Sequence, residues 1–200
     1  MTVNDRQSRL ARLHELMPSA SGIRDETLRQ TVFDLWLEVW AMSKWDDVAD
    51  CPSNPKLPGL PIIRQANCVA EMAVSVASLI EASYKELSFD RDRLLAGGLL
   101  LDASKIVEQE PTGEAGHSRF SSITGVMNHA VYGAHLAMNR GLEDGIVNII
   151  LSHTKLNNTA PMTPEAVVLH YVDYMLADCM RQKRGNGLLM MGDLSYGIKP

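Results

Sequence analysis

Apolar residues recur at spacings of three and four along most of this chain, which is the pattern of amphipathic helices. A short helix is predicted over residues 4–17, followed by a break at residues 19–22. A longer helix over residues 24–45 carries all three tryptophans, which we interpret as packing in the core or at a subunit interface, with a ligand-stacking wall as the alternative. Between residues 51 and 61 four prolines stand three apart, which favours a stiff, extended connector and forbids helix.

The remaining periodic segments predict a helical body. They cover residues 62–82, 93–107 with a cap at Asp90, 123–140, 142–154 and 164–180, with loops at residues 108–118 and 155–163. We find no strand pattern or internal repeat, so the predicted fold class is all-α. The predicted organisation is an N-terminal helical extension with a proline-rich connector (1–61), a helical body (62–184) and an irregular, glycine-rich tail (185–200).

Composition and charge narrow the function classes. The 200 residues are 46% hydrophobic and 22% charged, which suits one globular unit with a substantial core. Three cysteines without a C-x-x-C pair, and no leader-like N-terminus, predict a reducing, cytoplasmic setting. No apolar stretch approaches the roughly 20 residues that span a bilayer, so we expect no membrane association. A formal net charge of −5 lacks the broad positive field of nucleic-acid binders, so we expect a small-molecule substrate and no nucleic acid.

Ionisable residues interrupt four apolar helical runs, where each needs a partner or a function. These residues are Asp102, Lys105, His129, His153 and Asp173. An intrahelical ion pair would account for Asp102 and Lys105, and ordinary core and capping roles would account for the two histidines. Asp173 lies in the middle of an apolar helix, where an acid makes physical sense only with a partner.

The order of these residues resembles the HD-domain superfamily of metal-dependent phosphohydrolases, which is an all-α fold. The family pattern has a His on the first helix, a His-Asp doublet usually followed three residues later by Lys, further His on later helices and a final Asp. The five residues match this order over residues 62–180. In dinuclear members, the doublet Asp and the two later His hold the second metal. The resemblance therefore implies Asp102, His129 and His153 as metal ligands.

Two positions depart from that pattern. Gln65 stands where the family has its first His, with Asn67 as a less favoured alignment, and Leu101 replaces the His of the doublet. Leucine cannot bind a metal and a glutamine carbonyl is a weak ligand, so the ordinary one-metal centre is broken. The remaining set of two His and one carboxylate could hold one divalent metal, either iron, manganese or zinc, or none.

We therefore expect an HD-like enzyme, a hydrolase acting on a small organic or phosphorylated molecule through a remodelled site. Its five polar residues would work with one remnant metal or by metal-free acid–base chemistry. The alternative is a non-catalytic or accessory HD subunit. In either case the helix over residues 24–45 would supply the interface of a homodimer, or of a heteromer with an intact HD protein.

Overall fold

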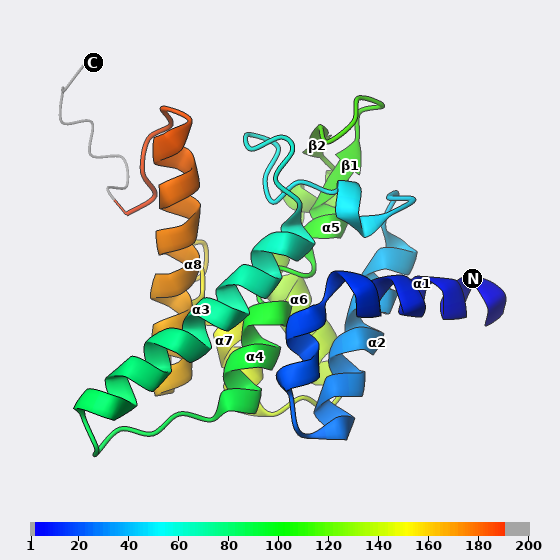
Figure 1. Cartoon of the computed structure of the whole chain (residues 1–200). Helices are drawn as coiled ribbons and strands as arrows, with labels where there is room; N and C mark the ends of the chain where they lie inside the picture. The colour runs from blue at the N-terminus through cyan, green and yellow to red at the C-terminus, as the bar shows by residue number, and fades with distance from the viewer. Residues whose placement is uncertain (1–2, 191–200) are drawn as a thin grey trace.

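The computed structural model describes residues 3–190 and confirms the all-α class, with one short hairpin added (Figure 1). The helices are α1 (Val3–Leu16), α2 (Glu26–Met42), α3 (Ile62–Ser83), α4 (Arg91–Leu100), α5 (Lys105–Glu108), α6 (His129–Asn139), α7 (Asp144–Ser152) and α8 (Pro164–Lys183). Short 3₁₀ turns are η1 (Pro18–Gly22), η2 (Val48–Asp50) and η3 (Ser122–Gly125). Strands β1 (Gln109–Pro111) and β2 (Ser118–Phe120) pair antiparallel. Residues 191–200 of the predicted tail lie outside the described residues.

Helix starts follow from local capping chemistry. Four helices begin at a side chain that accepts a backbone N–H of the first turn, namely Asp25 for α2, Asp90 for α4, Asn128 for α6 and Thr163 for α8. The predicted cap at Asp90 is confirmed. Within residues 3–190, none of the helices combines the length and apolarity that crossing a lipid bilayer requires. The cytoplasmic setting stays a prediction.

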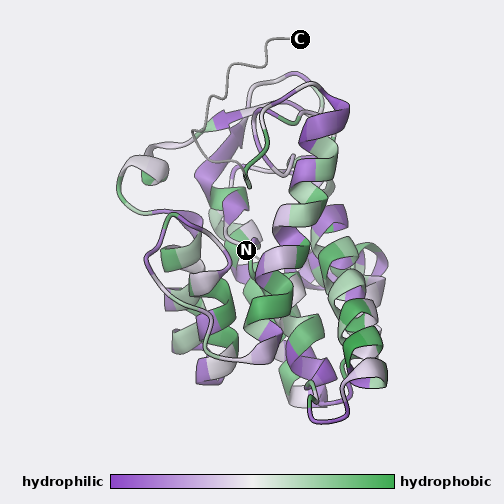
Figure 2. Ribbon diagram, turned by 90° about the vertical axis from the view of Figure 1, so that its left-hand side faces the viewer, coloured by the Kyte–Doolittle hydropathy of each residue, from purple (hydrophilic) through white to green (hydrophobic). Residues whose placement is uncertain are grey.

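The tryptophan-bearing segment packs into the core of its own chain. Trp36, Trp40 and Trp45 are 0%, 3% and 4% exposed, and Trp36 Nε1 donates a hydrogen bond to the carbonyl of Leu99 at 2.9 Å. One apolar cluster joins residues of α1 and α2 to residues of α4, α6 and α7. The most hydrophobic residues gather along the helices, which also carry hydrophilic residues (Figure 2). The tryptophan face is therefore not available as the expected subunit interface, and dimer or heteromer formation stays a prediction without an assigned surface.

The segment with the four spaced prolines, here called the proline loop, closes on itself, so the prediction of an extended connector is wrong. Pro52 and Pro61 pair in an isolated antiparallel bridge, and Ser53 N–H donates to the carbonyl of Leu60 at 2.7 Å. A proline fixes its own φ and keeps the residue before it out of the helical region, but neither restriction prevents the chain from reversing between prolines. The chain reverses between them, because Asn54 accepts the N–H of Lys56 on its side chain and forms a turn.

The predicted helix over residues 93–107 breaks after α4. A tight turn follows, in which Lys105 N–H donates to the carbonyl of Asp102 at 2.9 Å. Ser104 Oγ donates to the carbonyl of His129 at 2.6 Å and ties this turn to α6. The β1–β2 hairpin replaces part of the predicted loop, and its strands are too short to show a period-two pattern. The break places Asp102 in a turn at the end of α4 instead of on a continuous helix face.

Candidate metal centre

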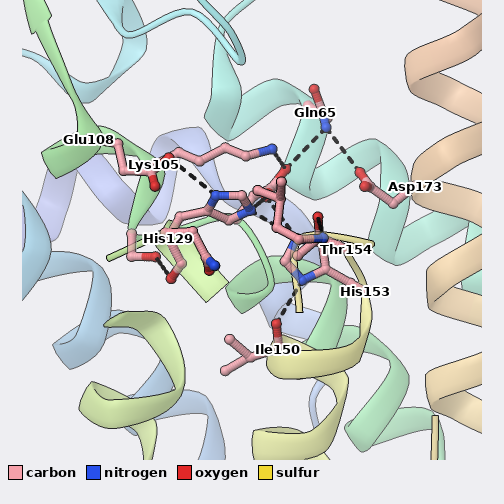
Figure 3. A network of polar contacts seen from close by, with 12 residues as sticks. Gln65, Lys105, Glu108, His129, Ile150, His153, Thr154 and Asp173 are labelled. Atoms are coloured by element: carbon pink, nitrogen blue, oxygen red, sulfur yellow. Dashed lines mark hydrogen bonds and ion pairs between the residues drawn. The ribbon is translucent and has the colours of Figure 1, made fainter. Parts of the chain in front are cut away.

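The five predicted site residues come together in one polar network, which Gln65 of α3 joins (Figure 3). Asp102 lies in the turn after α4, Lys105 begins α5, and His129 begins α6. His153 caps the C-terminus of α7, and Asp173 lies within α8. Helix ends thus supply most of these side chains, and the tertiary packing of α3, α4, α7 and α8 brings them to one place.

Three buried ligand atoms form a compact triangle in this network. Asp102 Oδ1 lies 3.4 Å from His129 Nε2 and 3.2 Å from His153 Nε2, and the two Nε2 atoms are 3.2 Å apart. The residues are 1%, 5% and 2% exposed, respectively. Asp102 Oδ1 has no hydrogen-bond partner. A buried carboxylate oxygen without a donor costs free energy, so this arrangement needs a positive group between the three atoms.

Contacts on the far sides of the two imidazole rings define which nitrogen carries hydrogen. His129 Nδ1 donates to Glu108 Oε2 at 3.1 Å, and His153 Nδ1 donates to the carbonyl of Ile150 at 2.7 Å. A carboxylate and a carbonyl can only accept, so in each neutral ring Nδ1 carries the hydrogen and Nε2 presents a lone pair. Burial and the positive charge of Lys105 lower the pKa of His129, which keeps this ring neutral. With both rings neutral, three lone pairs face one another.

The triangle fits a divalent metal ion. Ligands arranged tetrahedrally at about 2.0–2.2 Å from zinc lie about 3.3–3.6 Å from one another. The three observed separations of 3.2–3.4 Å are close to that range, and two imidazoles with one carboxylate suit iron, manganese and zinc alike. Glu108 and the Ile150 carbonyl orient the two rings in the way that outer-sphere partners of metal-binding histidines do.

On the other side of Asp102, the carboxylate oxygens already have hydrogen-bond donors. Asp102 Oδ2 accepts hydrogen bonds from Lys105 Nζ at 2.7 Å and from Gln65 Nε2 at 3.3 Å. Gln65 Nε2 also donates to Asp173 Oδ1 at 3.0 Å. Gln65, which we expected at the position of the first His of the family pattern, presents amide hydrogens to two carboxylates. Lys105 contributes a positive charge to this side of the site, and Gln65 contributes two hydrogen bonds.

Burial and neighbouring charges set the protonation of this side of the site. Burial opposes ionisation of Asp102, but the nearby positive charge of Lys105 favours it, and the pKa of Asp102 lies below its usual range. Burial likewise opposes the charge of Lys105, yet Asp102 and Asp173 raise the pKa of its ammonium. Burial and the negative charge of Asp102 raise the pKa of Asp173. Asp173 is consequently the acid of the site best suited to hold a proton.

A cavity of about 560 Å³, here called the metal-side cavity, opens onto the network. Lys105, His129, His153 and Asp173 line its floor, and residues of the proline loop form part of its wall. Glu108 also lines it and was missed in the sequence, where it falls at the start of a predicted loop. The sequence feature that could have identified Glu108 is its position three residues after Lys105, one turn along the same short helix.

Comparisons with known proteins agree with this geometry. The profile of the HD domain family matches residues 69–178. Ribonuclease Y of Thermotoga petrophila and of Thermotoga maritima are each 35% identical to the chain over 109 residues, and Ribonuclease Y of Pseudothermotoga lettingae is 31% identical over 109 residues. Each match covers 54% of this chain and 18% of the relative, so the matched region is a small part of those proteins. No solved structure matches the chain at a significant level.

These relatives correct one expectation. A small-molecule substrate, with no nucleic acid as partner, was expected from the net charge, but the curated relatives are named as enzymes that act on RNA. Net charge is a sum over the whole surface, whereas a phosphate meets only the charges that line one cavity. Two lysines, Lys105 and Lys155, line the metal-side cavity.

Proposed function

The chain belongs to the HD domain family, and from this we infer that it hydrolyses phosphodiester bonds of RNA with one divalent metal held by Asp102, His129 and His153. The observation that carries the proposal is the convergence of three buried ligand atoms, one of which is a carboxylate oxygen without a hydrogen-bond partner. RNA as the substrate class is supported by the Ribonuclease Y relatives. The two buried carboxylates of Asp102 and Glu108, against the single ammonium of Lys105, also favour a bound cation.

Each side chain has a distinct task in this reaction. A divalent cation, when bound, polarises a phosphoryl oxygen and supplies an activated nucleophile at neutral pH. Lys105 Nζ uses one hydrogen for Asp102 Oδ2 and has two more for the non-bridging oxygens of a phosphate in the cavity. Asp173 lines the same cavity and holds a proton for the departing oxygen. Gln65 keeps the Asp102 and Asp173 carboxylates in place.

The proposal is tested with single-stranded RNA and purified protein. Chelator-treated chain should cleave a 5′-labelled oligoribonucleotide only after manganese, iron(II) or zinc is added. His129→Ala should abolish cleavage, because it removes one ligand. His135→Ala is the matched control, because it removes an exposed histidine of the same helix that contacts Asn139 and not the metal centre.

Two outcomes contradict the proposal. Equal cleavage by wild type and the His129 variant would show that the activity does not come from this centre. No cleavage by wild type with any of the three metals would favour the accessory-subunit alternative, in which another HD protein supplies the chemistry.

A further inference from the structure

A second groove lies beside the metal-side cavity, along the exposed face of α8. Its volume is about 940 Å³, and its lining includes His170, Tyr171, Tyr174, Lys155 and Lys183. We refer to it as the α8 groove. Lys155 and Tyr174 line both hollows, so the α8 groove and the metal-side cavity are adjacent. A chain whose phosphate lies at the metal centre can therefore extend into this groove.

Aromatic rings form an ordered stack in the α8 groove. The rings of His170 and Tyr174 stack with centroids 4.9 Å apart and planes 21° from parallel, and Tyr171 meets His170 edge-on at 5.4 Å. Tyr174 Oη accepts the N–H of Lys155 at 3.0 Å, and His170 Nδ1 donates to the carbonyl of Ser152 at 3.0 Å. Two rings are thus held in place by the backbone. Tyr171 remains 70% exposed on α8 and offers the open ring surface.

The charges that line the groove favour a polyanion. Lys155 Nζ lies 5.3 Å from the centroid of the Tyr174 ring, and Lys183 lines the same groove. The acid of the groove, Asp178, is buried and accepts the backbone N–H groups of Leu189 and Met190. These two N–H groups stabilise its carboxylate, and with two lysines against one acid the lining of the groove has a net positive charge.

We propose that the α8 groove binds an unpaired nucleobase of single-stranded RNA, with Tyr171 as the stacking surface and Lys155 beside the connecting phosphate. The proposal rests on the proposed function, because the RNA strand at the metal centre is what brings a base to this groove. Every base has a π-face, so a tyrosine platform accepts bases with little sequence preference. His170 Nε2 carries a free lone pair, since Nδ1 donates to Ser152, and can accept a hydrogen bond from an exocyclic amine.

Binding without metal separates this proposal from catalysis. Fluorescence anisotropy with a labelled oligoadenylate, in the presence of chelator, measures affinity while the strand stays intact. Tyr171→Ala should weaken binding about 5- to 150-fold, the range for losing one base stack, and Tyr171→Phe should restore it. Tyr84→Ala is the matched control, because Tyr84 is another exposed tyrosine, 58% exposed at the end of α3, and should leave affinity unchanged.

A strand with one abasic position completes the test. Moving the abasic position along the strand should reveal a site where wild type loses affinity and Tyr171→Ala loses nothing further. Unchanged binding by Tyr171→Ala, or additive losses at every position, would overturn the base platform, and an apolar protein segment would then be the better occupant. If Tyr171-dependent binding occurs but the metal-loaded chain cuts no RNA, the proposed hydrolysis fails and the platform stands. If wild type and Tyr171→Ala both cut RNA and bind it with the same affinity, the proposed hydrolysis stands and only the base platform fails.

Discussion

Gly98 lies in α4 where this helix crosses α3, and replacing it with alanine tests the packing that positions the metal centre. An added Cβ would lie 2.6 Å from Ala70 Cα and 2.9 Å from both Ala70 N and Ala70 Cβ. Carbon atoms pack favourably at about 3.5–4.0 Å, so the two helices would have to separate by about 1 Å. Helix α3 carries Gln65 and α4 leads into Asp102, so this separation also stretches their hydrogen bond.

The cost follows from the kind of atoms that the new methyl group meets. Overpacking a core costs about 1–3 kcal/mol, and the upper end applies because the atoms of Ala70 cannot rotate away. Alanine gains about 1 kcal/mol over glycine in helix propensity, which leaves a net loss of about 2 kcal/mol. Gly97→Ala is the milder comparison, because its Cβ would meet side-chain atoms only, namely Ile149 Cδ1, Leu169 Cδ1 and Ile149 Cγ2 at 2.8, 2.9 and 3.0 Å, and no backbone atom. Side chains can shift more easily than backbone, so we expect a net loss of less than about 1 kcal/mol.

Urea unfolding followed by tryptophan fluorescence measures both variants, since all three tryptophans are buried. We expect the Gly98 variant to unfold at clearly lower urea than wild type and the Gly97 variant near wild type. Equal stability of the two variants, or a Gly98 variant as stable as wild type, would refute the close-packing argument.

Three further predictions concern single side chains. Lys105→Gln should slow single-turnover RNA cleavage by about 10²-fold or more, because a positive charge beside the phosphate is lost. The variant should still bind one metal ion, and unchanged cleavage would show that Lys105 has no part in the reaction. Trp36→Phe should cost about 1–3 kcal/mol in urea unfolding, because the buried carbonyl of Leu99 loses its donor; a cost near zero would contradict this. Burial opposes ionisation of Glu165, but the N–H of Asp90 and the charge of Arg93 outweigh burial and lower the pKa of this carboxyl. The ionised Glu165 therefore stabilises the folded protein above the pKa of the unfolded state, and this stabilisation is lost as the pH falls through the folded pKa. Wild type should therefore lose stability between about pH 5 and about pH 3 more steeply than Glu165→Gln, and parallel curves would argue against it.

Helix starts could be predicted because their causes are local in sequence. Asp90 accepts N–H groups two and three residues ahead, and Pro164 stands in the first turn of α8. The break after Leu100 could not be predicted, because the apolar run continues through Leu101 with helical spacing. A contact distant in sequence, from Ser104 to the carbonyl of His129, accompanies that break. Closure of the proline loop likewise depends on hydrogen bonds between its two ends.

The polar network could be located from polar residues in apolar runs, since burial makes an unpartnered charge costly. All five predicted residues lie in one network. Their contacts could not be derived in the same way. Glu108 orients His129 from the end of a helix too short to recognise, and Gln65 bridges two carboxylates that lie 37 and 108 residues away. The expected substrate class, a small molecule, was the largest error, because the net charge of the whole chain does not determine the charges that line one cavity.

Metal content after equilibrium dialysis tests the account most directly. Wild type dialysed against manganese or zinc should bind one ion per chain, and His135→Ala should bind the same amount. Asp102→Ala and His129→Ala should each bind far less than one ion at the same free metal, because loss of a ligand should exceed the about 10–100-fold loss of affinity that follows changes to outer-sphere partners. Wild type that binds no metal, or a His129 variant that keeps a full ion, would contradict the centre built from Asp102, His129 and His153.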